Sequence, residues 1–358
     1  MSYQTDDLKI VEIKELMAPS VLRSEYPITD NAARCVHMAR ADVQKILHGK
    51  DDRLLVIVGP CSIHDADAAS EYAGRLLALR KKLIDDLVII MRVYFEKPRT
   101  TVGWKGLIND PNLDGSFEIN KGLRIARKLL LDLNEMGLPA GTEYLDLVSP
   151  QYVADLVSWG AIGARTTESQ VHRELASGLS CPVGFKNATS GDMQVAVDAV
   201  GSATHPHHFL SVTKAGRSAI FSTTGNPDCH VILRGGREPN YNQENINSAA
   251  RMLEKSGLEP RLMVDFSHAN SFKQHDKQME VGQSIVAQFN AGDTRIFGVM
   301  IESHLVAGRQ DAKPGTELTY GQSITDACMG WETTDELLHM LAGAVRVRRD
   351  ANSAVSAA

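Results

Sequence analysis

Short apolar runs alternate with longer amphipathic segments along most of the chain. Many of the runs are rich in β-branched residues, and all are too short for helices, which predicts strands buried on both faces. The segments between them, such as 71–80, 122–134 and 169–177, repeat their apolar positions at helical spacing. The eight expected strands are 54–58, 87–91, 138–142, 161–164, 182–185, 230–233, 262–266 and 296–301.

Strands that alternate with helices indicate a parallel sheet, and eight such units close into a (β/α)8 TIM barrel of about 250 residues. We therefore expect an α/β barrel over residues 51–350. Two parts of the chain exceed it. Residues 1–50 predict an N-terminal extension, an arm followed by a helix at 31–47, and residues 209–224 predict an inserted β-hairpin.

Composition narrows the class of protein. Of 358 residues, 43% are hydrophobic, and 38 basic side chains against 44 acidic ones give a net charge of −6, so a disordered chain is excluded. No apolar run approaches the roughly 20 residues of a membrane span, and the acidic start lacks the apolar core of a secretory leader. An isoelectric point near 6.1 argues against nucleic-acid binding. Five scattered cysteines favour free thiols and a cytoplasmic location.

A reactive or charged side chain follows every expected strand. In chain order these side chains are Cys61, Arg92, Glu143, Arg165, Lys186, Arg234, His268 and Glu302. Barrel enzymes build their active sites at the carboxyl ends of the strands. The pattern therefore predicts an active site at that end of the barrel.

Positive charge dominates this predicted site. The segment after the second strand carries Arg92, Lys97 and Arg99, and three further strands end near Arg165, Lys186 and Arg234. Arginine matches the geometry of carboxylates and phosphates, and lysine acts as a point charge. Six cations on one rim repel one another unless anions bind there. The set predicts a small substrate with several negative groups, or two such substrates.

Four further side chains are candidate metal ligands. Cys61, His268, Glu302 and Asp326 each lie at a strand end or just beyond the last strand. Sulfur, imidazole and carboxylate together suit a first-row divalent ion such as Mn, Fe, Co, Zn or Cu. Their separation in sequence matches no local metal motif, so packing of a buried cysteine and histidine stays open as the alternative.

The ordered motifs carry a family resemblance. Across essentially the whole length, the chain resembles the bacterial type I 3-deoxy-D-arabino-heptulosonate-7-phosphate (DAHP) synthases, with features of the phenylalanine-regulated form. The matching blocks are GPCSIH at 59–64, RVYFEKPRTT at 92–101, GARTTE at 163–168, GFKN at 184–187, LRGG at 233–236, DFSHAN at 265–270, MIES at 300–303 and SITD at 323–326.

The resemblance implies an enzyme (EC 2.5.1.54) that condenses phosphoenolpyruvate with D-erythrose 4-phosphate in the first step of the shikimate pathway. Arg165, Arg234 and Lys186 are then expected to hold the phosphate of phosphoenolpyruvate. Its carboxylate is expected to meet Arg92, Lys97 and Lys186. The stretch Lys97, Pro98, Arg99 and Thr100 is expected to seat the sugar phosphate. The four candidate ligands are expected to bind Mn, Fe, Co or Zn. Glu143 either orients the water or pairs with a cation.

Regulation by an aromatic amino acid, with phenylalanine favoured, also follows from the resemblance. The residues expected in the effector pocket are Asp6, Asp7, Pro150, Ser180, Phe209 and Ser211. Ser211 is the informative position, because glycine there leaves room for the hydroxyl of tyrosine. Each of these side chains also fits an ordinary loop or hairpin. Family members further imply a homodimer or homotetramer in which the arm reaches a neighbouring subunit.

Two alternatives remain from the sequence. The sister enzyme 3-deoxy-manno-octulosonate-8-phosphate synthase uses arabinose 5-phosphate, but the KPRT block, the arm and the hairpin favour erythrose 4-phosphate. The second alternative is a catalytically silent barrel that only senses an aromatic amino acid. Such a protein is expected to lack a metal ligand or an anion-binding arginine, but this chain has every candidate metal ligand and every candidate arginine.

Overall fold

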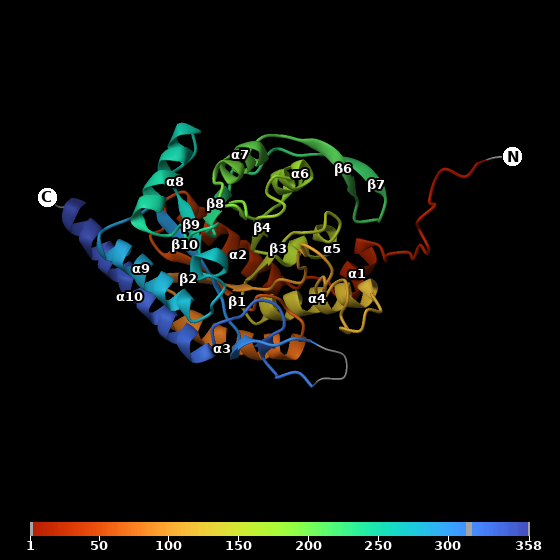
Figure 1. Ribbon diagram of the computed structural model, residues 1–358, viewed down its shortest axis with the longest axis horizontal. Helices are drawn as coiled ribbons and strands as arrows, with labels where there is room; N and C mark the ends of the chain where they lie inside the picture. Colours follow the sequence, from red (N-terminus) through yellow and green to blue (C-terminus); the bar gives the residue numbers. More distant parts are fainter. Residues whose placement is uncertain (1–2, 313–316, 357–358) are drawn as a thin grey trace.

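The computed structural model describes residues 3–312 and 317–356 and contains a closed barrel of eight parallel strands (Figure 1). Around the barrel the order is β1-β10-β9-β8-β5-β4-β3-β2. The strands are β1 (Leu54–Gly59), β2 (Leu87–Arg92), β3 (Ala140–Glu143), β4 (Trp159–Ile162), β5 (Val183–Lys186), β8 (Cys229–Leu233), β9 (Leu262–Asp265) and β10 (Ile296–Glu302). The predicted barrel is confirmed, and its fourth strand begins two residues before the expected 161–164.

Helices cover the outside of the barrel (Figure 1). They are α1 (Pro19–Glu25), α2 (Asp30–Leu47), α3 (Ala66–Lys82), α4 (Ile119–Glu135), α5 (Pro150–Val153), α6 (Gln170–Gly178), α7 (Gln194–Ala203), α8 (Gln243–Lys255), α9 (Lys277–Asn290) and α10 (Trp331–Ser356). Two 3-10 turns, η1 (Ala154–Leu156) and η2 (His268–Ser271), and a short strand pair, β11 (Val306–Arg309) and β12 (Gln322–Ser323), complete the set with the hairpin described below. Among the described residues, no helix is both long and apolar enough to cross a bilayer.

The barrel strands divide their side chains between two apolar layers. In β1, Leu54, Val56 and Val58 belong to the large cluster that the surrounding helices share, whereas Leu55 and Ile57 belong to a second cluster inside the barrel. Because successive side chains of a strand point to opposite faces, a continuous apolar run is needed to fill both layers. This explains why the strands read as uninterrupted hydrophobic runs.

Helix α2 packs against the amino end of the barrel. Its Val43, Ile46 and Leu47 join the interior cluster, and its first turn is capped by Thr29, whose Oγ1 accepts from the Ala32 amide at 3.1 Å. The amino end is thereby filled with apolar side chains. The carboxyl end is left as the place for polar chemistry.

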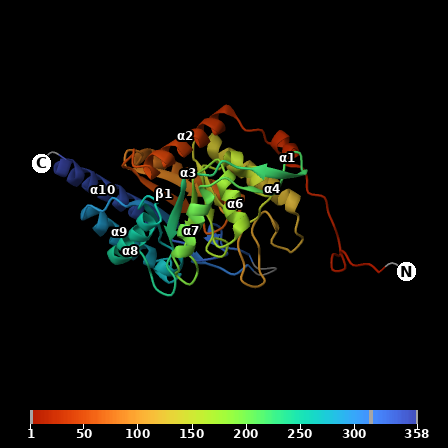
Figure 2. The same cartoon turned by 90° about the horizontal axis from the view of Figure 1, so that it is seen from above.

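The two additions to the barrel lie on one side of it. The arm extends away from the body in both views, and the hairpin of β6 (His208–Val212) and β7 (Ser218–Ser222) lies beside α6 (Figures 1 and 2). Lys214 at the hairpin tip joins them to the barrel: its carbonyl accepts from Ser20 N at 2.7 Å, and its Nζ donates to Gln151 O at 2.7 Å. The division of the chain at residue 50 stays a prediction.

A buried arginine joins helix α4 to the segment after α1 and to α5 and η1. Arg127 of α4 is fully buried, donates to the carbonyls of Tyr26 and Tyr152 at 2.9 and 2.7 Å, and pairs with Asp155 at 2.9 and 3.0 Å. We predict that Arg127→Ala lowers the free energy of unfolding by about 3–5 kcal/mol, because Asp155 loses its main buried partner. Urea unfolding followed by circular dichroism measures this loss.

The neighbouring Lys128 supplies the control. It pairs with Asp132 one helical turn away, and both side chains are more than half exposed, so Lys128→Ala is expected to change the free energy of unfolding by less than about 0.5 kcal/mol. Equal effects of the two substitutions contradict the prediction.

Candidate active site

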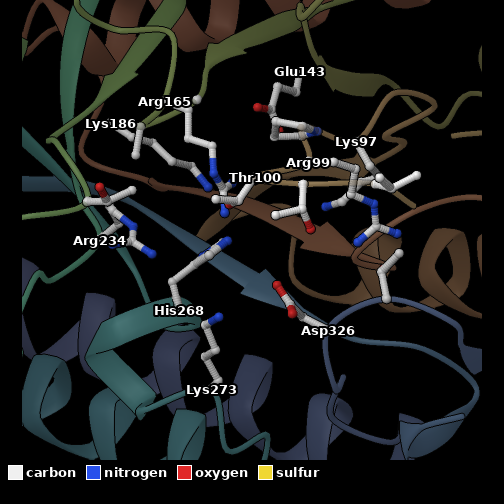
Figure 3. Close-up of a pocket in the computed structure, with 17 residues that line it drawn as sticks. Lys97, Arg99, Thr100, Glu143, Arg165, Lys186, Arg234, His268, Lys273 and Asp326 are labelled. Carbon is white, nitrogen blue, oxygen red and sulfur yellow. The ribbon is translucent and has the colours of Figure 1, made fainter. Parts of the chain in front are cut away.

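A polar cavity of about 300 Å³ opens at the carboxyl ends of the barrel strands (Figure 3). Basic side chains reach it from several sides, and His268, Lys273 and Asp326 lie across it from Arg165 and Glu143. The structure therefore brings together most of the residues predicted for the site. Those that line the cavity are Lys97, Pro98, Arg99, Thr100, Glu143, Arg165, Lys186, Arg234, His268 and Asp326.

The strand ends set the positions of these side chains. Glu143 and Lys186 are the last residues of β3 and β5, and Arg234 directly follows β8. Arg165 is held three residues beyond β4 by a turn in which the amides of Thr166 and Thr167 donate to the carbonyl of residue 163. A Cβ on Gly163 would stand 2.1 Å from Oε1 of Glu143, so a larger residue at this position would displace the carboxylate of Glu143 from its present place on the cavity wall.

Arg92 is fully buried and does not line the cavity. Its Nη2 donates to Glu302 Oε1 at 2.8 Å and to Cys61 O at 3.2 Å, and its guanidinium lies 3.6 Å from the centre of the Tyr94 ring. Burial acts to lower the pKa of Arg92, but Tyr94, Glu302 and Cys61 raise it on balance. Arg92 therefore stays charged and forms a buried ion pair below the wall of the cavity.

Lys97 connects this buried layer to the cavity. Its Nζ lies 3.2 Å from Cys61 Sγ and 3.1 Å from Cys61 O, while its side chain lines the cavity. Burial acts to lower the pKa of Lys97, and Cys61 with Glu302 raises it overall. The ammonium group of Lys97 therefore contacts the candidate metal ligand Cys61 while the side chain lines the cavity.

Three of the four candidate metal ligands converge. Ligand atoms of Cys61, Glu302 and Asp326 all lie within 4.8 Å of one another. His268 Nε2 is 3.9 Å from Glu302 Oε1, but His268 is not one of the residues whose ligand atoms are all mutually within 4.8 Å. The imidazole therefore lies beside this group. A thiol and carboxylates with an adjacent imidazole fit a borderline divalent ion, and one first-row metal could be held there.

Burial of Asp326 alone would raise its pKa, but Lys97, His268 and Lys273 together lower it. The carboxylate form, which is the form that binds cations, is therefore favoured in the protein without help from a metal ion.

Two charged residues in or beside the cavity, Asp265 and Lys273, were not predicted from the sequence. Asp265 ends β9 fully buried and contacts both Lys186 and His268. Lys273 lines the cavity from a loop in which His268, Phe272 and Lys273 all adopt left-handed backbone angles, a conformation that costs about 1–3 kcal/mol for each bulky residue. An acidic residue that ends a fully apolar strand was a usable signal for Asp265. No motif or strand end near Lys273 in the sequence distinguished it from other surface lysines.

The residues expected for the effector are only partly together. Phe209 and Ser211 line a mostly apolar pocket of about 270 Å³ with Leu147 and Leu175. Pro150 is buried at the start of α5, and Ser180 is exposed before β5. Asp6 and Asp7 are exposed in the arm, and neither lines this pocket within the single chain. The effector site stays a prediction.

Glu96 is a buried acid directly before Lys97 in the chain. It accepts from Ser149 Oγ at 2.9 Å and from the Asp146 amide at 3.3 Å. Burial, with the nearby carboxylate of Asp146, raises the pKa of Glu96 to about 8. The native protein therefore holds a proton there at neutral pH that the unfolded chain releases near its ordinary pKa of 4.5.

Between about pH 4.5 and pH 8 the native state binds this proton and the unfolded state does not. We therefore predict that the free energy of unfolding falls as pH rises through this range. Glu96→Gln is expected to make the free energy of unfolding less dependent on pH, so that the variant becomes more stable relative to the native protein towards pH 8. Urea midpoints measured across this range test it. The exposed Glu336 gives the control Glu336→Gln, and equal pH slopes in all three proteins contradict the assignment.

Over most of its length the chain is similar to proteins of one family. A family model described as the DAHP synthetase I family matches residues 25–339. The Phe-sensitive phospho-2-dehydro-3-deoxyheptonate aldolase of Escherichia coli is 64% identical over 98% of this chain and 100% of its own length. The corresponding aldolase of Haemophilus influenzae is 60% identical over 97% of this chain and 96% of its own. A solved aldolase structure from Francisella tularensis superimposes with a TM-score of 0.92 at 57% identity, covering 95% of this chain and 99% of that one.

Proposed function

The chain belongs to the DAHP synthetase I family, and from this premise we propose that its cavity condenses phosphoenolpyruvate with D-erythrose 4-phosphate and water to give DAHP and inorganic phosphate. This reaction is the first step of aromatic amino acid biosynthesis. One observation carries the proposal for the site: five of the six predicted cations converge on a single 300 Å³ cavity beside a thiol and two carboxylates.

Phosphoenolpyruvate binds at the end of the cavity where the arginines gather. Arg165 and Arg234 take its phosphate with help from Lys186. Burial and the neighbouring Arg165 act together to lower the pKa of Arg234, which is relieved when a dianion lies between the two. The carboxylate meets Lys97 and Lys186 on the cavity wall, with the buried Arg92 behind them.

Erythrose 4-phosphate binds towards the other end. Lys97 and Arg99 face its phosphate, and Thr100 supplies a hydroxyl donor. The two substrates bring negative charges close together, so the main tasks of the cavity are positioning and charge neutralisation. Lys273, across the cavity, adds a further positive charge.

Carbon 3 of phosphoenolpyruvate attacks the aldehyde carbon of the sugar, water adds at carbon 2, and the resulting hemiketal phosphate loses inorganic phosphate. A divalent ion held by Cys61, His268, Glu302 and Asp326 supplies Lewis acidity towards the aldehyde when bound; Mn, Fe, Co and Zn all suit these ligands. Glu143, on the cavity wall next to Gly163, orients the water or balances a nearby cation.

Arg165→Ala tests the assignment of the phosphate site. We expect kcat/KM for phosphoenolpyruvate to fall about 100-fold, because charge-assisted hydrogen bonds of about 1.5–3 kcal/mol are lost, while circular dichroism shows an unchanged fold. A phosphate-release assay measures it, with Arg251→Ala on the exposed face of α8 as the control. Unchanged phosphoenolpyruvate kinetics would remove Arg165 from the site, and turnover with arabinose 5-phosphate in place of erythrose 4-phosphate would favour the sister enzyme.

The pocket at the hairpin is the proposed effector site. Apolar Leu147, Leu175 and Phe209 suit an aromatic ring, and the E. coli relative is named Phe-sensitive. Phenylalanine is therefore the proposed feedback inhibitor. Asp6 and Asp7 reach this pocket only if the arm of a neighbouring subunit supplies them, in keeping with a homodimer or homotetramer in the cytoplasm.

Ser211→Gly tests the choice of effector. Removing the side chain of Ser211, which lines the pocket, leaves room for a phenolic hydroxyl. We expect the native enzyme to respond to phenylalanine and the variant to gain inhibition by tyrosine. Titrations of the native and variant enzymes with all three aromatic amino acids measure this. Inhibition of the native enzyme by tyrosine alone reverses the assignment.

A further inference from the structure

Asp265 is the most highly connected acid near the cavity, and no function is yet assigned to it. Its Oδ2 accepts from Lys186 Nζ at 2.9 Å and lies 2.8 Å from His268 Nδ1. Its Oδ1 accepts from the amide and hydroxyl of Ser267 at 3.0 and 2.6 Å. One fully buried carboxylate thus touches a cation proposed for phosphate binding and an imidazole proposed for metal binding.

The contacts fix which nitrogen of His268 carries the proton. A carboxylate only accepts hydrogen bonds, and the hydroxyl of Ser267 is already donating to Asp265, so Nδ1 of His268 must be the donor. Nε2 is then the nitrogen left to face a metal ion, and it lies 3.9 Å from Glu302 Oε1. This is the arrangement that orients a histidine towards a metal ion.

Lys186 shares the same oxygen atom. The ammonium group and the imidazole both point at Oδ2, so they divide the negative charge of one carboxylate between them. The salt bridge is almost completely buried, with 4% of the lysine and none of the aspartate side chain exposed. A change in the strength of one contact must therefore change the other.

We propose that Asp265 couples metal binding to phosphoenolpyruvate binding. The inference rests on the proposed function. A metal ion bound by His268 would make Nδ1–H a stronger hydrogen-bond donor, and Asp265 would then share more of its negative charge with His268. Lys186 is then less tightly held and is available to the phosphate or carboxylate of phosphoenolpyruvate. By linkage, each ligand tightens the binding of the other by the same factor. Asp265 acts through its two neighbours and is a positioning residue.

Calorimetric titration of the full chain tests the coupling. Phosphoenolpyruvate is titrated with and without Mn²⁺, and Mn²⁺ with and without phosphoenolpyruvate. We expect the native protein to bind phosphoenolpyruvate at least about fivefold more tightly when Mn²⁺ is present, within the usual range of coupling between sites. Equal affinity under the two conditions overturns the proposal.

Asp265→Asn keeps an acceptor and removes the charge. We expect Mn²⁺ affinity to fall about 10- to 100-fold, as when a partner of a ligating histidine is lost, and the coupling factor to approach one. Asp293→Asn is the matched control, because Asp293 is also a buried, ion-paired acid but pairs with Arg295 before β10. Its coupling factor should stay native. Native coupling in Asp265→Asn overturns the proposal.

Lys186→Gln keeps the proposal testable if Asp265→Asn does not fold. This variant is expected to bind Mn²⁺ nearly as well as the native protein and phosphoenolpyruvate more weakly, with no coupling between them. Persistent coupling in Lys186→Gln contradicts the shared carboxylate. Failure of the proposed function is detected separately. If it is wrong, the native enzyme releases no phosphate when both substrates and Mn²⁺ are supplied, whatever the coupling between the two ligands.

Discussion

Concentrating positive charge at one end of a barrel is the constraint on which the rest of the structure depends. Cations in a partly buried space repel one another and are costly to desolvate. The protein balances part of this charge internally, because Arg92 pairs with Glu302 and Lys186 with Asp265. Arg165 and Arg234, which also line the cavity, remain available to anions, and the phosphate and carboxylate groups of the proposed substrates would complete the balance.

These buried ion pairs also contact the candidate metal ligands. Glu302 contacts Arg92 and faces His268, Cys61 lies beside Lys97, and Asp265 joins His268 to Lys186. Two candidate ligands, Glu302 and Cys61, therefore contact a cation proposed for substrate binding directly. A third, His268, is joined to such a cation through Asp265. The proposed anion site and the proposed metal site therefore share one hydrogen-bonded layer, so the geometry of one depends on the other.

A short segment links the hairpin pocket to the same layer. Leu147 lines the pocket next to Ser211, while Asp146 and Ser149 bond to Glu96, which directly precedes Lys97. Residues 146–149 thus reach the proposed effector pocket through Leu147 and contact Glu96, the chain neighbour of the cavity-lining Lys97, through Asp146 and Ser149. Contiguous packed contacts of this kind can carry coupling between sites, provided that the segment has two arrangements whose balance both sites shift.

The sequence by itself determined the barrel, because both layers of a parallel sheet must be filled and only uninterrupted apolar runs do this. It also predicted that Arg165, Lys186, Arg234 and the candidate metal ligands lie close together, since residues just beyond parallel strands must meet at one end of the barrel. Tertiary structure alone decided which of them face the cavity: Arg92, in the same motif as Lys97, turns into a buried ion pair. It also revealed Asp265 and Lys273, whose roles depend on side chains from other strands and on a left-handed loop. Periodicity and spacing record the order of residues along the chain, whereas the sharing of one carboxylate by two partners is fixed only when distant strands pack together.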